Sequence, residues 1–311
     1  MKKQFASVLL LSFLFSNLSS ASLKVALNWK PEPQFGGFYE AERAGFFKKE
    51  NLEIQILEGG SGTPTVQMLA NDKVDFAVVS AEEILIYNDK NPKNKVVAIF
   101  ASFQTNPQII MTHNERGFTS LKQVFESPGV VALQSGLSYV AFLEKKWGRP
   151  KAQLVPYLGG ITNFLNNPNY SQQGFLTSEP VAAELRGLKV KTFLVADEGY
   201  NPYATVVAVK KDFLTKNEKQ TQGFIKALRQ GWADYLIHPE ATNQLMAQKN
   251  KGMDPETFKK SSAAQVKLIQ PDPNFKLGTM TTARWTQLRE QMFDLKLIPS
   301  KSAKEIDFIN L

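Results

Sequence analysis

The side chains best suited to chemistry in this chain are carboxylates and aromatic rings that follow predicted strands. Trp29 and Phe35 follow a first strand, Glu82 follows the buried strand at 75–80, and Glu179 follows a later strand. Carboxylates accept hydrogen bonds from N–H groups, and aromatic rings stack on planar molecules. These groups favour recognition of a planar, N–H-rich ligand over bond-making chemistry.

The chain has few residues suited to other kinds of chemistry. The chain has no cysteine and only two histidines, His113 and His238. Zinc sites in proteins are built mostly from Cys and His, and thiol catalysis needs a cysteine. We therefore expect no catalytic residue, no metal site, no cofactor and no enzymatic activity.

The elements that position the first candidate residues alternate between strand and helix. We predict strands at 23–27, 52–57 and 75–80, with helices at 37–47 and from 63 to about 71. This alternation is typical of an α/β fold with a mostly parallel sheet flanked by helices. Open sheets of this kind bind ligands at the edge where their strands end. The predicted ligand-binding residues at that edge are Trp29, Phe35, Tyr39, Gly60, Ser61, Gly62, Thr63, Ser80 and Glu82.

A second α/β unit follows, with strands at 129–133, 153–157, 173–176 and 189–195. Polar segments at 113–119 and 196–203 read as crossings between the units, and two crossings predict a two-strand hinge that lets two lobes close on a ligand. We assign residues 22–113 and 200–311 to lobe 1, and 114–199 to lobe 2. The second lobe and the hinge add the candidates Gln104, Gln134, Ser135, Glu179, Asn201 and Tyr203.

Each candidate has a structural alternative. Trp29 could cover the core, and Gly59 to Gly62 could be a plain tight turn, because glycine commonly marks turns. Serine and glutamate at a helix start, as at Ser80 and Glu179, also serve as helix caps.

The charge of the candidate turns bears on the ligand. The turns hold no Lys or Arg, but they hold Glu82, Glu83 and Glu179. A sulfonate or phosphate site is expected to aim cations or several N–H groups at the anion. A neutral or weakly cationic heterocycle fits better, although an anion site at a helix terminus stays open.

The N-terminus predicts export. Lys2 and Lys3 precede a short apolar segment at 8–15, and small residues end at Ala21, as in a cleavable signal peptide over 1–21. The expected location is the periplasm. The remaining positive charge is scattered, without the basic stripe that nucleic-acid binding requires, so we expect no nucleic-acid partner.

The chain resembles periplasmic substrate-binding proteins of ABC importers, in the group similar to the thiamine-pyrimidine-precursor synthases. The matching motifs are Asn28-Trp29, Ala44 to Phe47, Gly59 to Thr63, Val74 to Val78, Glu179-Pro180 and Gly199 to Tyr203. The resemblance implies a two-lobed type II binding-protein fold, a monomer, and an ABC permease as partner.

The resemblance also implies a ligand class. A thiamine-pyrimidine precursor is the first choice, and riboflavin or a sulfonate are alternatives of the same fold. The synthase branch of the group carries a cysteine-rich motif and uses histidine chemistry on pyridoxal phosphate, and this chain lacks both. A synthase-like enzyme and a sensor domain are the remaining alternatives.

Overall fold

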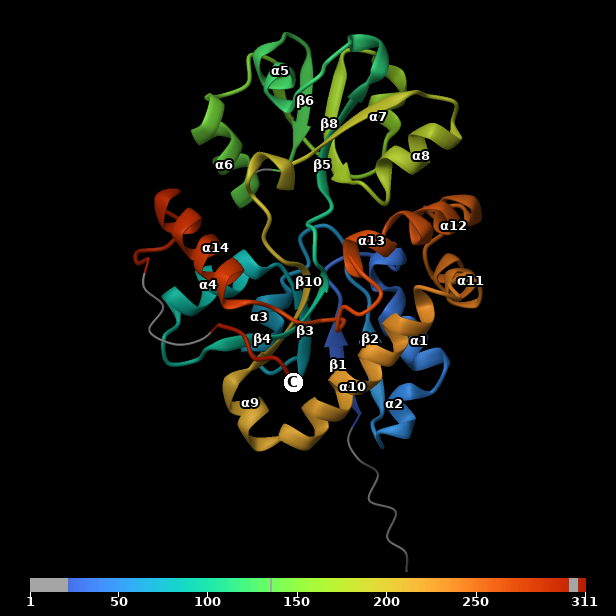
Figure 1. Cartoon of the computed structure of the whole chain (residues 1–311), viewed down its shortest axis with the longest axis vertical. Coiled ribbons are helices and arrows are strands. Elements are labelled where there is room, and N and C mark those ends of the chain that lie inside the picture. The colour runs from blue at the N-terminus through green and yellow to red at the C-terminus, as the bar shows by residue number, and fades with distance from the viewer. Residues whose placement is uncertain (1–21, 135, 302–306) are drawn as a thin grey trace, which may run out of the picture.

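Two five-stranded sheets divide the molecule into two lobes (Figure 1). The computed structural model describes residues 22–134, 136–301 and 307–311, so the predicted signal peptide and Ser135 lie outside the described residues. The first sheet has the order β2-β1-β3-β10-β4 and the second the order β7-β6-β8-β5-β9. The first sheet contains β1 (Leu23–Ala26), β2 (Ile54–Leu57), β3 (Phe76–Val79), β4 (Val96–Phe103) and β10 (Ala204–Lys210). The second contains β5 (Gln108–His113), β6 (Val130–Leu133), β7 (Gln153–Pro156), β8 (Tyr170–Phe175) and β9 (Val190–Leu194).

Helices cover both sheets. The first lobe carries α1 (Gly36–Arg43), α2 (Phe46–Lys49), α3 (Thr65–Ala70), α4 (Ala81–Lys90), α9 (Lys211–Lys216), α10 (Glu218–Tyr235), α11 (Glu240–Lys249), α12 (Pro255–Ala264), α13 (Val266–Ile269) and α14 (Thr282–Asp294). The second carries α5 (Leu121–Glu126), α6 (Ser138–Trp147), α7 (Thr162–Asn166) and α8 (Glu179–Leu185). Short 3-10 turns are η1 (Pro33–Phe35), η2 (Asn114–Arg116) and η3 (Ala196–Glu198). Within the described ranges, no helix has the length and apolar character needed to span a membrane.

Both sheets are mostly parallel, as predicted, with four strands running in one direction and one strand antiparallel to them. In the first sheet β1 is parallel to β2 and β3, whereas β10 is antiparallel to β3 and β4. The second sheet repeats this pattern, with β6 parallel to β7 and β8, and β5 antiparallel to β8 and β9. The antiparallel strands β5 and β10 are those that enter each sheet directly from the other lobe. The parallel β2-β1-β3 part confirms that the three candidate turns of lobe 1 open on one edge.

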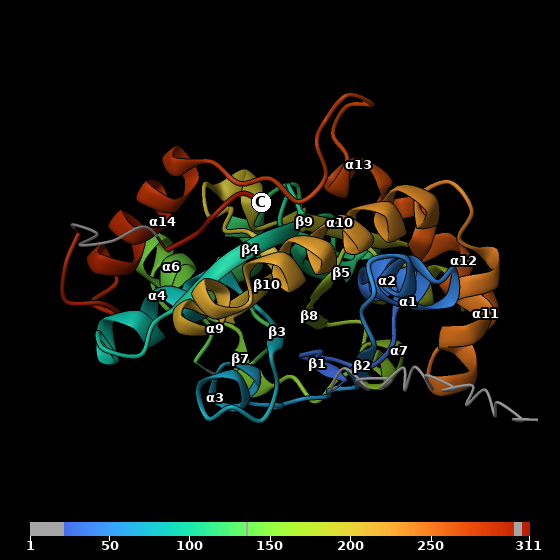
Figure 2. The same cartoon turned by 90° about the horizontal axis from the view of Figure 1, so that it is seen from below.

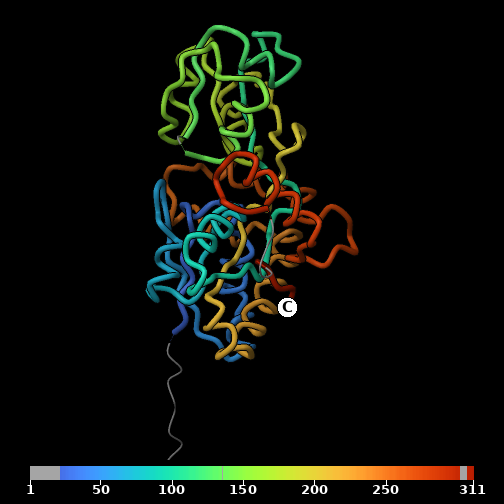
Figure 3. The backbone as a smooth tube through the Cα atoms, turned by 90° about the vertical axis from the view of Figure 1, so that its left-hand side faces the viewer, coloured from blue at the N-terminus to red at the C-terminus, as the bar shows by residue number. Residues whose placement is uncertain are grey.

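The first crossing lies earlier in the chain than predicted. Residues 108–113 were assigned to lobe 1, but they form β5, which pairs with β8 and β9 of the second sheet. The chain therefore crosses at 104–107, and the polar segment after His113 forms η2 instead. The local pattern was misleading because Ile109, Ile110 and Met111 are equally apolar whichever sheet receives them. The chain returns between β9 and β10, and Figure 3 shows both connections between the lobes.

The first sheet is buried on both faces because its strand residues alternate between two apolar clusters. Val25, Phe76 and Val78 face the cluster with α1 and α10, while Ala77 and Val79 face the cluster with α3, α4 and α14. The large side chains on the apolar face of α10 are fully buried: Phe224, Leu228, Trp232 and Tyr235. Figure 2 shows α11 and α12 outside α1 and α2.

Helices α1 and α10 cross in close contact. A Cβ atom added to Gly231 would lie 2.2 Å from the carbonyl oxygen of Gly37, and one added to Gly37 would lie 2.3 Å from the ring of Trp232. Each helix therefore needs a residue without a side chain at the crossing.

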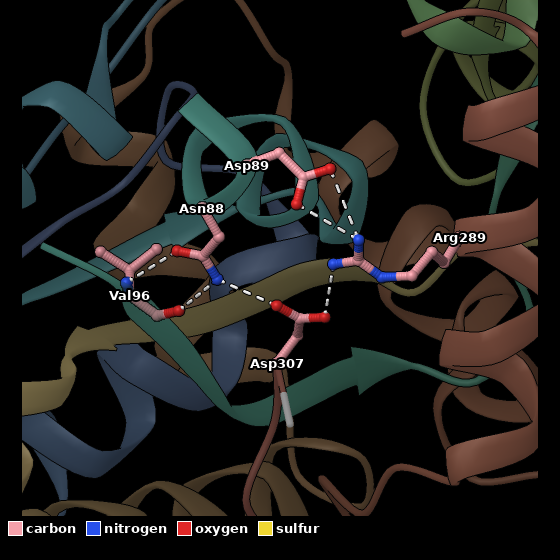
Figure 4. A network of polar contacts seen from close by, with 5 residues as sticks. All are labelled: Asn88, Asp89, Val96, Arg289 and Asp307. Atoms are coloured by element: carbon pink, nitrogen blue, oxygen red, sulfur yellow. Dashed lines mark hydrogen bonds and ion pairs between the residues drawn. The ribbon is translucent and has the colours of Figure 1, made fainter. Parts of the chain in front are cut away.

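The C-terminal residues complete the free edge of the first sheet. Ala98 of β4 donates to the Asp307 carbonyl at 2.9 Å, and Ile309 donates back to the Ala98 carbonyl at 2.8 Å. The Asp307 carboxylate accepts from Arg289 Nη2 at 2.8 Å and from Asn88 Nδ2 at 3.0 Å (Figure 4). Arg289 also contacts Asp89 at 3.2 Å. This buried network fixes the C-terminal segment and α14 to α4.

Candidate functional site

A buried carboxylate occupies the first turn of lobe 1. Glu32 is 8% exposed and sits at the start of η1, directly before Pro33. Its Oε1 accepts from the indole Nε1 of Trp29 at 3.1 Å, and its Oε2 accepts from Gln34 Nε2 at 3.2 Å. Burial, assisted by the charge of Glu179, raises the pKa of Glu32 to about 7, against the two hydrogen bonds and Lys30, which lower it.

A second carboxylate begins helix α8 of lobe 2. Glu179 Oε2 accepts from the backbone N–H of Phe175 at 2.8 Å, and Oε1 accepts from the Tyr157 hydroxyl at 2.5 Å. Burial raises its pKa, and the Tyr157 and Phe175 donors oppose the shift. Among the described residues, no Lys, Arg or His side chain contributes to the pKa shift of Glu179. Glu179 therefore ties down the turn before α8 without capping the helix, whose N-cap is Ser178, and its charge also acts on Glu32 of lobe 1.

The two lobes meet at these carboxylates. The charge of Glu179 acts on Glu32, and both carboxylates act on the hydroxyl of Tyr157 and raise its pKa further. Nearby, α8 of lobe 2 contacts α12 of lobe 1 (Figure 1). The arrangement joins two acids and two aromatic hydrogen-bond donors, Trp29 and Tyr157, from opposite lobes. It presents acceptor oxygens and flat apolar rings together.

A third carboxylate, in the first turn of α4, contacts the other lobe. Glu82 Oε1 accepts from the Ser138 hydroxyl of α6 at 3.1 Å, whereas its Oε2 is buried without a hydrogen-bond partner in the described structure. Burial raises the pKa of Glu82 to about 7, and the charge of Glu83 adds to the shift. Tyr200 of the return crossing lies close enough for Glu82 to raise its pKa as well. Glu82 is therefore an inter-lobe contact with one free acceptor.

Ser80 acts as a helix cap. Its backbone N–H and its hydroxyl both donate to Glu83 Oε2, at 2.8 and 3.0 Å, in a capping box at the start of α4. This is the structural alternative stated for such residues. Glu82 takes no part in this capping box.

The glycine-rich turn closes on itself. The N–H of Gly60 donates to Thr63 Oγ1 at 2.8 Å, and the N–H of Thr63 donates to the Gly60 carbonyl at 3.1 Å. Gly62 adopts φ 79°, and Ser61 and Gly62 are exposed. These contacts are those of a tight turn. A Cβ on Gly60 would meet no atom within 4 Å, so the turn leaves open space beside it.

Phe35 and Tyr39 belong to the apolar core. Each is 1% exposed within the cluster that includes α10, and Phe35 packs edge-on against Phe38 at 6.4 Å. Burial raises the pKa of the Tyr39 hydroxyl. Of the aromatic residues predicted for the first turn, Trp29 alone is partly exposed and contacts a site carboxylate.

The predicted hinge residues hold the crossings together. Gln104 Nε2 donates to the carbonyls of Ala101 and Thr279, at 3.1 and 3.2 Å. Asn201 Oδ1 accepts from the N–H of Asn106 at 2.8 Å. Tyr203 is buried, and its hydroxyl accepts from the N–H of Thr281 at 3.0 Å. Their polar groups are thus engaged within the hinge.

In lobe 2, the turn after β6 is anchored by a glutamine of β8. The N–H of Gln134 donates to Gln173 Oε1 at 2.5 Å, and the Tyr139 hydroxyl donates to the same oxygen at 2.6 Å. Gln134 itself is half-buried.

Glu32 and Tyr157 are the site residues that sequence reasoning missed. Glu32 lies between Pro31 and Pro33 in the same turn as Trp29, so its position after a predicted strand was a usable signal. Tyr157 directly follows β7, and the local sequence does not show which strand β7 pairs with. Throughout the ranges the structure covers, no group of three or more His, Cys, Asp and Glu side chains is arranged to hold a metal ion.

Comparison with known proteins identifies the family of the chain. The family profile described as NMT1/THI5 like matches residues 32–124 and 171–242, more than half of the chain. The riboflavin-binding protein RibY of Chloroflexus aurantiacus is 23% identical over 244 residues, which cover 72% of this chain and 65% of that protein. This chain therefore spans less than two thirds of that relative. A putative thiamine biosynthesis protein of Haemophilus influenzae is 20% identical over 251 residues, covering 76% of each chain.

Solved structures show the same fold. The periplasmic aliphatic sulphonate binding protein of Escherichia coli superposes with a TM-score of 0.69 at 14% identity, over 94% of this chain and 97% of that one. The likeness confirms the two-lobed architecture of periplasmic binding proteins, predicted from the motifs.

Proposed function

Because the chain belongs to the NMT1/THI5-like family, we propose that it is a periplasmic solute-binding protein that captures a small aromatic nitrogen heterocycle for an ABC importer. A thiamine-pyrimidine precursor is the first ligand we propose, and riboflavin is the second. The protein performs no chemistry on its ligand. Capture between the lobes and delivery of the closed form to a permease are its whole mechanism.

The observation that carries this proposal is the pairing of Glu32 and Glu179 across the lobes. Two carboxylates that act on each other in a buried setting disfavour their ionised forms, and each raises the cost of bringing the lobes together. A ligand that places N–H donors or a positive charge between them removes that cost. Ligand binding then favours the closed arrangement, because the ligand binds it better than the open one.

The same geometry disfavours an anionic ligand. A sulfonate beside Glu32 and Glu179 would add like charge to two carboxylates, and the nearby Lys30 lowers the pKa of Glu32 by less than burial and Glu179 raise it. An aminopyrimidine offers N–H groups to these acceptors. Its flat ring matches Trp29 and Tyr157, since offset and edge-on aromatic contacts add to the burial of ring surface.

Riboflavin is retained because of a specific relative. The Chloroflexus aurantiacus protein is named for riboflavin binding, and an isoalloxazine ring also combines a flat face with polar edges. The open space beside Gly60 offers a path for a longer ligand. An aminopyrimidine needs no such path, so the two candidate ligands are distinguished by their size.

The test is a ligand screen on the mature protein. Thermal shift and native mass spectrometry would compare a hydroxymethyl aminopyrimidine, riboflavin, taurine and an amino acid mixture. We expect stabilisation by a heterocycle, reduced in Glu179→Gln and retained in Glu184→Gln, an exposed glutamate on the same helix. Stabilisation by taurine with none by either heterocycle would overturn the proposal.

A further inference from the structure

One arginine holds both connections between the lobes. Arg284 lies in the first turn of α14 and donates from Nη1 to the carbonyl of Gln104 at 2.5 Å. Its Nη2 donates to the carbonyl of Asn201 at 2.8 Å and contacts Asn201 Oδ1 at 3.3 Å. Gln104 begins the outgoing crossing at 104–107, and Asn201 lies in the return crossing at 195–203. The two crossings are therefore joined through a single side chain that belongs to neither.

The guanidinium is held firmly in this position. Its Cζ lies 3.7 Å from the centroid of the Tyr203 ring, as a cation stacked on an aromatic face. The N–H of Thr281, at the start of the same helix, donates to the Tyr203 hydroxyl at 3.0 Å. Burial lowers the pKa of Arg284, yet arginine keeps its charge in proteins. The side chain therefore stays a charged, planar fork between the two crossings.

Helix α14 is itself fixed to lobe 1. Arg289, one turn and a half further on, pairs with Asp89 of α4 and with Asp307. Trp285 stacks on Phe308 at 5.8 Å. Arg284 thus connects the crossings to a rigid part of the first lobe, and the crossings are also joined directly by the hydrogen bond from Asn106 to Asn201.

We propose that Arg284 is a positioning residue of the hinge, which sets the angle between the lobes and so tunes ligand affinity without contacting the ligand. The planar fork fixes the spacing of the Gln104 and Asn201 carbonyls in a way that a lysine ammonium, a single point charge, does not. When the fork is removed, the crossings keep the hydrogen bonds from Asn106 to Asn201 and to the Pro202 carbonyl. The ligand-free lobes then sample wider angles.

The proposal predicts a particular change in binding. Apparent affinity falls in proportion to the fraction of molecules in the binding-competent arrangement. For Arg284→Gln we expect an affinity about three- to tenfold lower, and for Arg284→Lys a smaller loss. The ligand readout rests on the proposed function, whereas the lobe angle does not.

The experiment measures the distance between lobes in ligand-free protein. The chain has no cysteine, so Lys219→Cys on lobe 1 and Lys151→Cys on lobe 2, both at exposed positions, accept one spin label each. Double electron–electron resonance then gives the distribution of distances between the labels. We expect Arg284→Gln to broaden it toward longer distances and Arg284→Lys to give an intermediate width.

The matched control is Arg289→Gln, on the same helix. It removes the contacts to Asp89 and Asp307 without touching the crossings, and α14 keeps its anchor through the stacking of Trp285 on Phe308. We therefore expect a lower Tm with an unchanged distance distribution. An unchanged distribution in Arg284→Gln, with a Tm loss like that of Arg289→Gln, would show a merely structural role and overturn the proposal. If Arg284→Gln does not fold, Arg284→Lys decides: wild-type width there overturns the proposal. Absence of heterocycle binding leaves this test intact, because no ligand is present.

Discussion

Glu32 and Glu179 come from opposite lobes, yet the charge of Glu179 raises the pKa of Glu32. Each carboxylate is held by an aromatic donor of its own lobe, Trp29 for Glu32 and Tyr157 for Glu179. The contact between lobes at this point is therefore electrostatically unfavourable unless a proton or a ligand intervenes. This relationship determines how the protein should respond to substitution and to pH.

Replacing Glu179 with Gln should weaken heterocycle binding. The substitution keeps the shape but removes a charged acceptor, and hydrogen bonds to charged groups contribute about 1.5–3 kcal/mol, which corresponds to about a 10- to 100-fold loss of affinity. Isothermal titration calorimetry measures it. Glu184→Gln on the same helix should bind as wild type, and equal affinities in all three proteins would contradict the assignment.

Replacing Glu32 with Gln should stabilise the ligand-free protein at alkaline pH. The ionised carboxylate is buried, 8% exposed, next to another acid, and a neutral amide avoids that desolvation cost. At pH 8 the Tm should rise, while at pH 4 it should change little because Glu32 is then protonated. Differential scanning calorimetry at both pH values provides the comparison. A fall in Tm of the same size at both pH values would contradict this prediction and show that Glu32 stabilises the fold independently of its charge.

The wild-type protein should lose stability as the pH rises from about 4.5 to 7. Glu32 and Glu82 have folded-state pKa values of about 7, raised from 4.5, so the folded state holds their protons more tightly than the unfolded state does. Their stabilising contribution is complete below pH 4.5 and is lost as the pH passes 7, by about 1–3 kcal/mol for each group. Urea unfolding at several pH values should show this slope. The double variant Glu32→Gln with Glu82→Gln should flatten it, and a slope that persists would assign it to other groups.

Gly231→Ala should destabilise the first lobe. The added methyl group would lie 2.2 Å from the Gly37 carbonyl, which belongs to the backbone of α1 and cannot move alone. Overpacking of this kind costs about 1–3 kcal/mol, measured as a lower Tm. Gly60→Ala is the control for stability, because its methyl group meets no atom within 4 Å. An unchanged or higher Tm in Gly231→Ala would contradict the prediction, because alanine favours a helix more than glycine does and only the close crossing opposes it.

Asp307→Ala should release the C-terminal segment. It leaves the buried Arg289 with only Asp89 and removes an acceptor from Asn88. Loss of one partner of a buried pair costs about 3–5 kcal/mol. Unfolding by urea measures the change, and Asp197→Ala, at an exposed position, is the control. Equal stability of both variants would show that Asp89 alone satisfies Arg289.

The alternation of strand and helix predicted the parallel part of each sheet, because local apolar patterns determine element type. It could not place β5, because the choice between two sheets depends on partners far along the chain, such as Gln173 and Thr192. The same limit applies to the site. Trp29 and Glu179 were predicted as ligand-binding residues from their positions after strands, but their connection through Glu32 and Tyr157 exists only once the lobes are placed together. Ser80 and Tyr203 were predicted to bind the ligand because a polar or aromatic residue in a turn gives the same local pattern whether it binds a ligand, caps a helix or supports a hinge.

The insertion of lobe 2 between β4 and β10 has a consequence for the order of folding. All five strands of the second sheet lie within one continuous stretch, so every partner has been synthesised once β9 is complete. The first sheet lacks its inner strand β10 until later, and its outer edge waits for residues 307–309, which lie still further along the chain. Pairing of distant segments is slow because loop-closure entropy is lost first. We therefore expect a chain shortened at its C-terminus to keep an intact second lobe and to lose the sheet that carries Trp29 and Glu32.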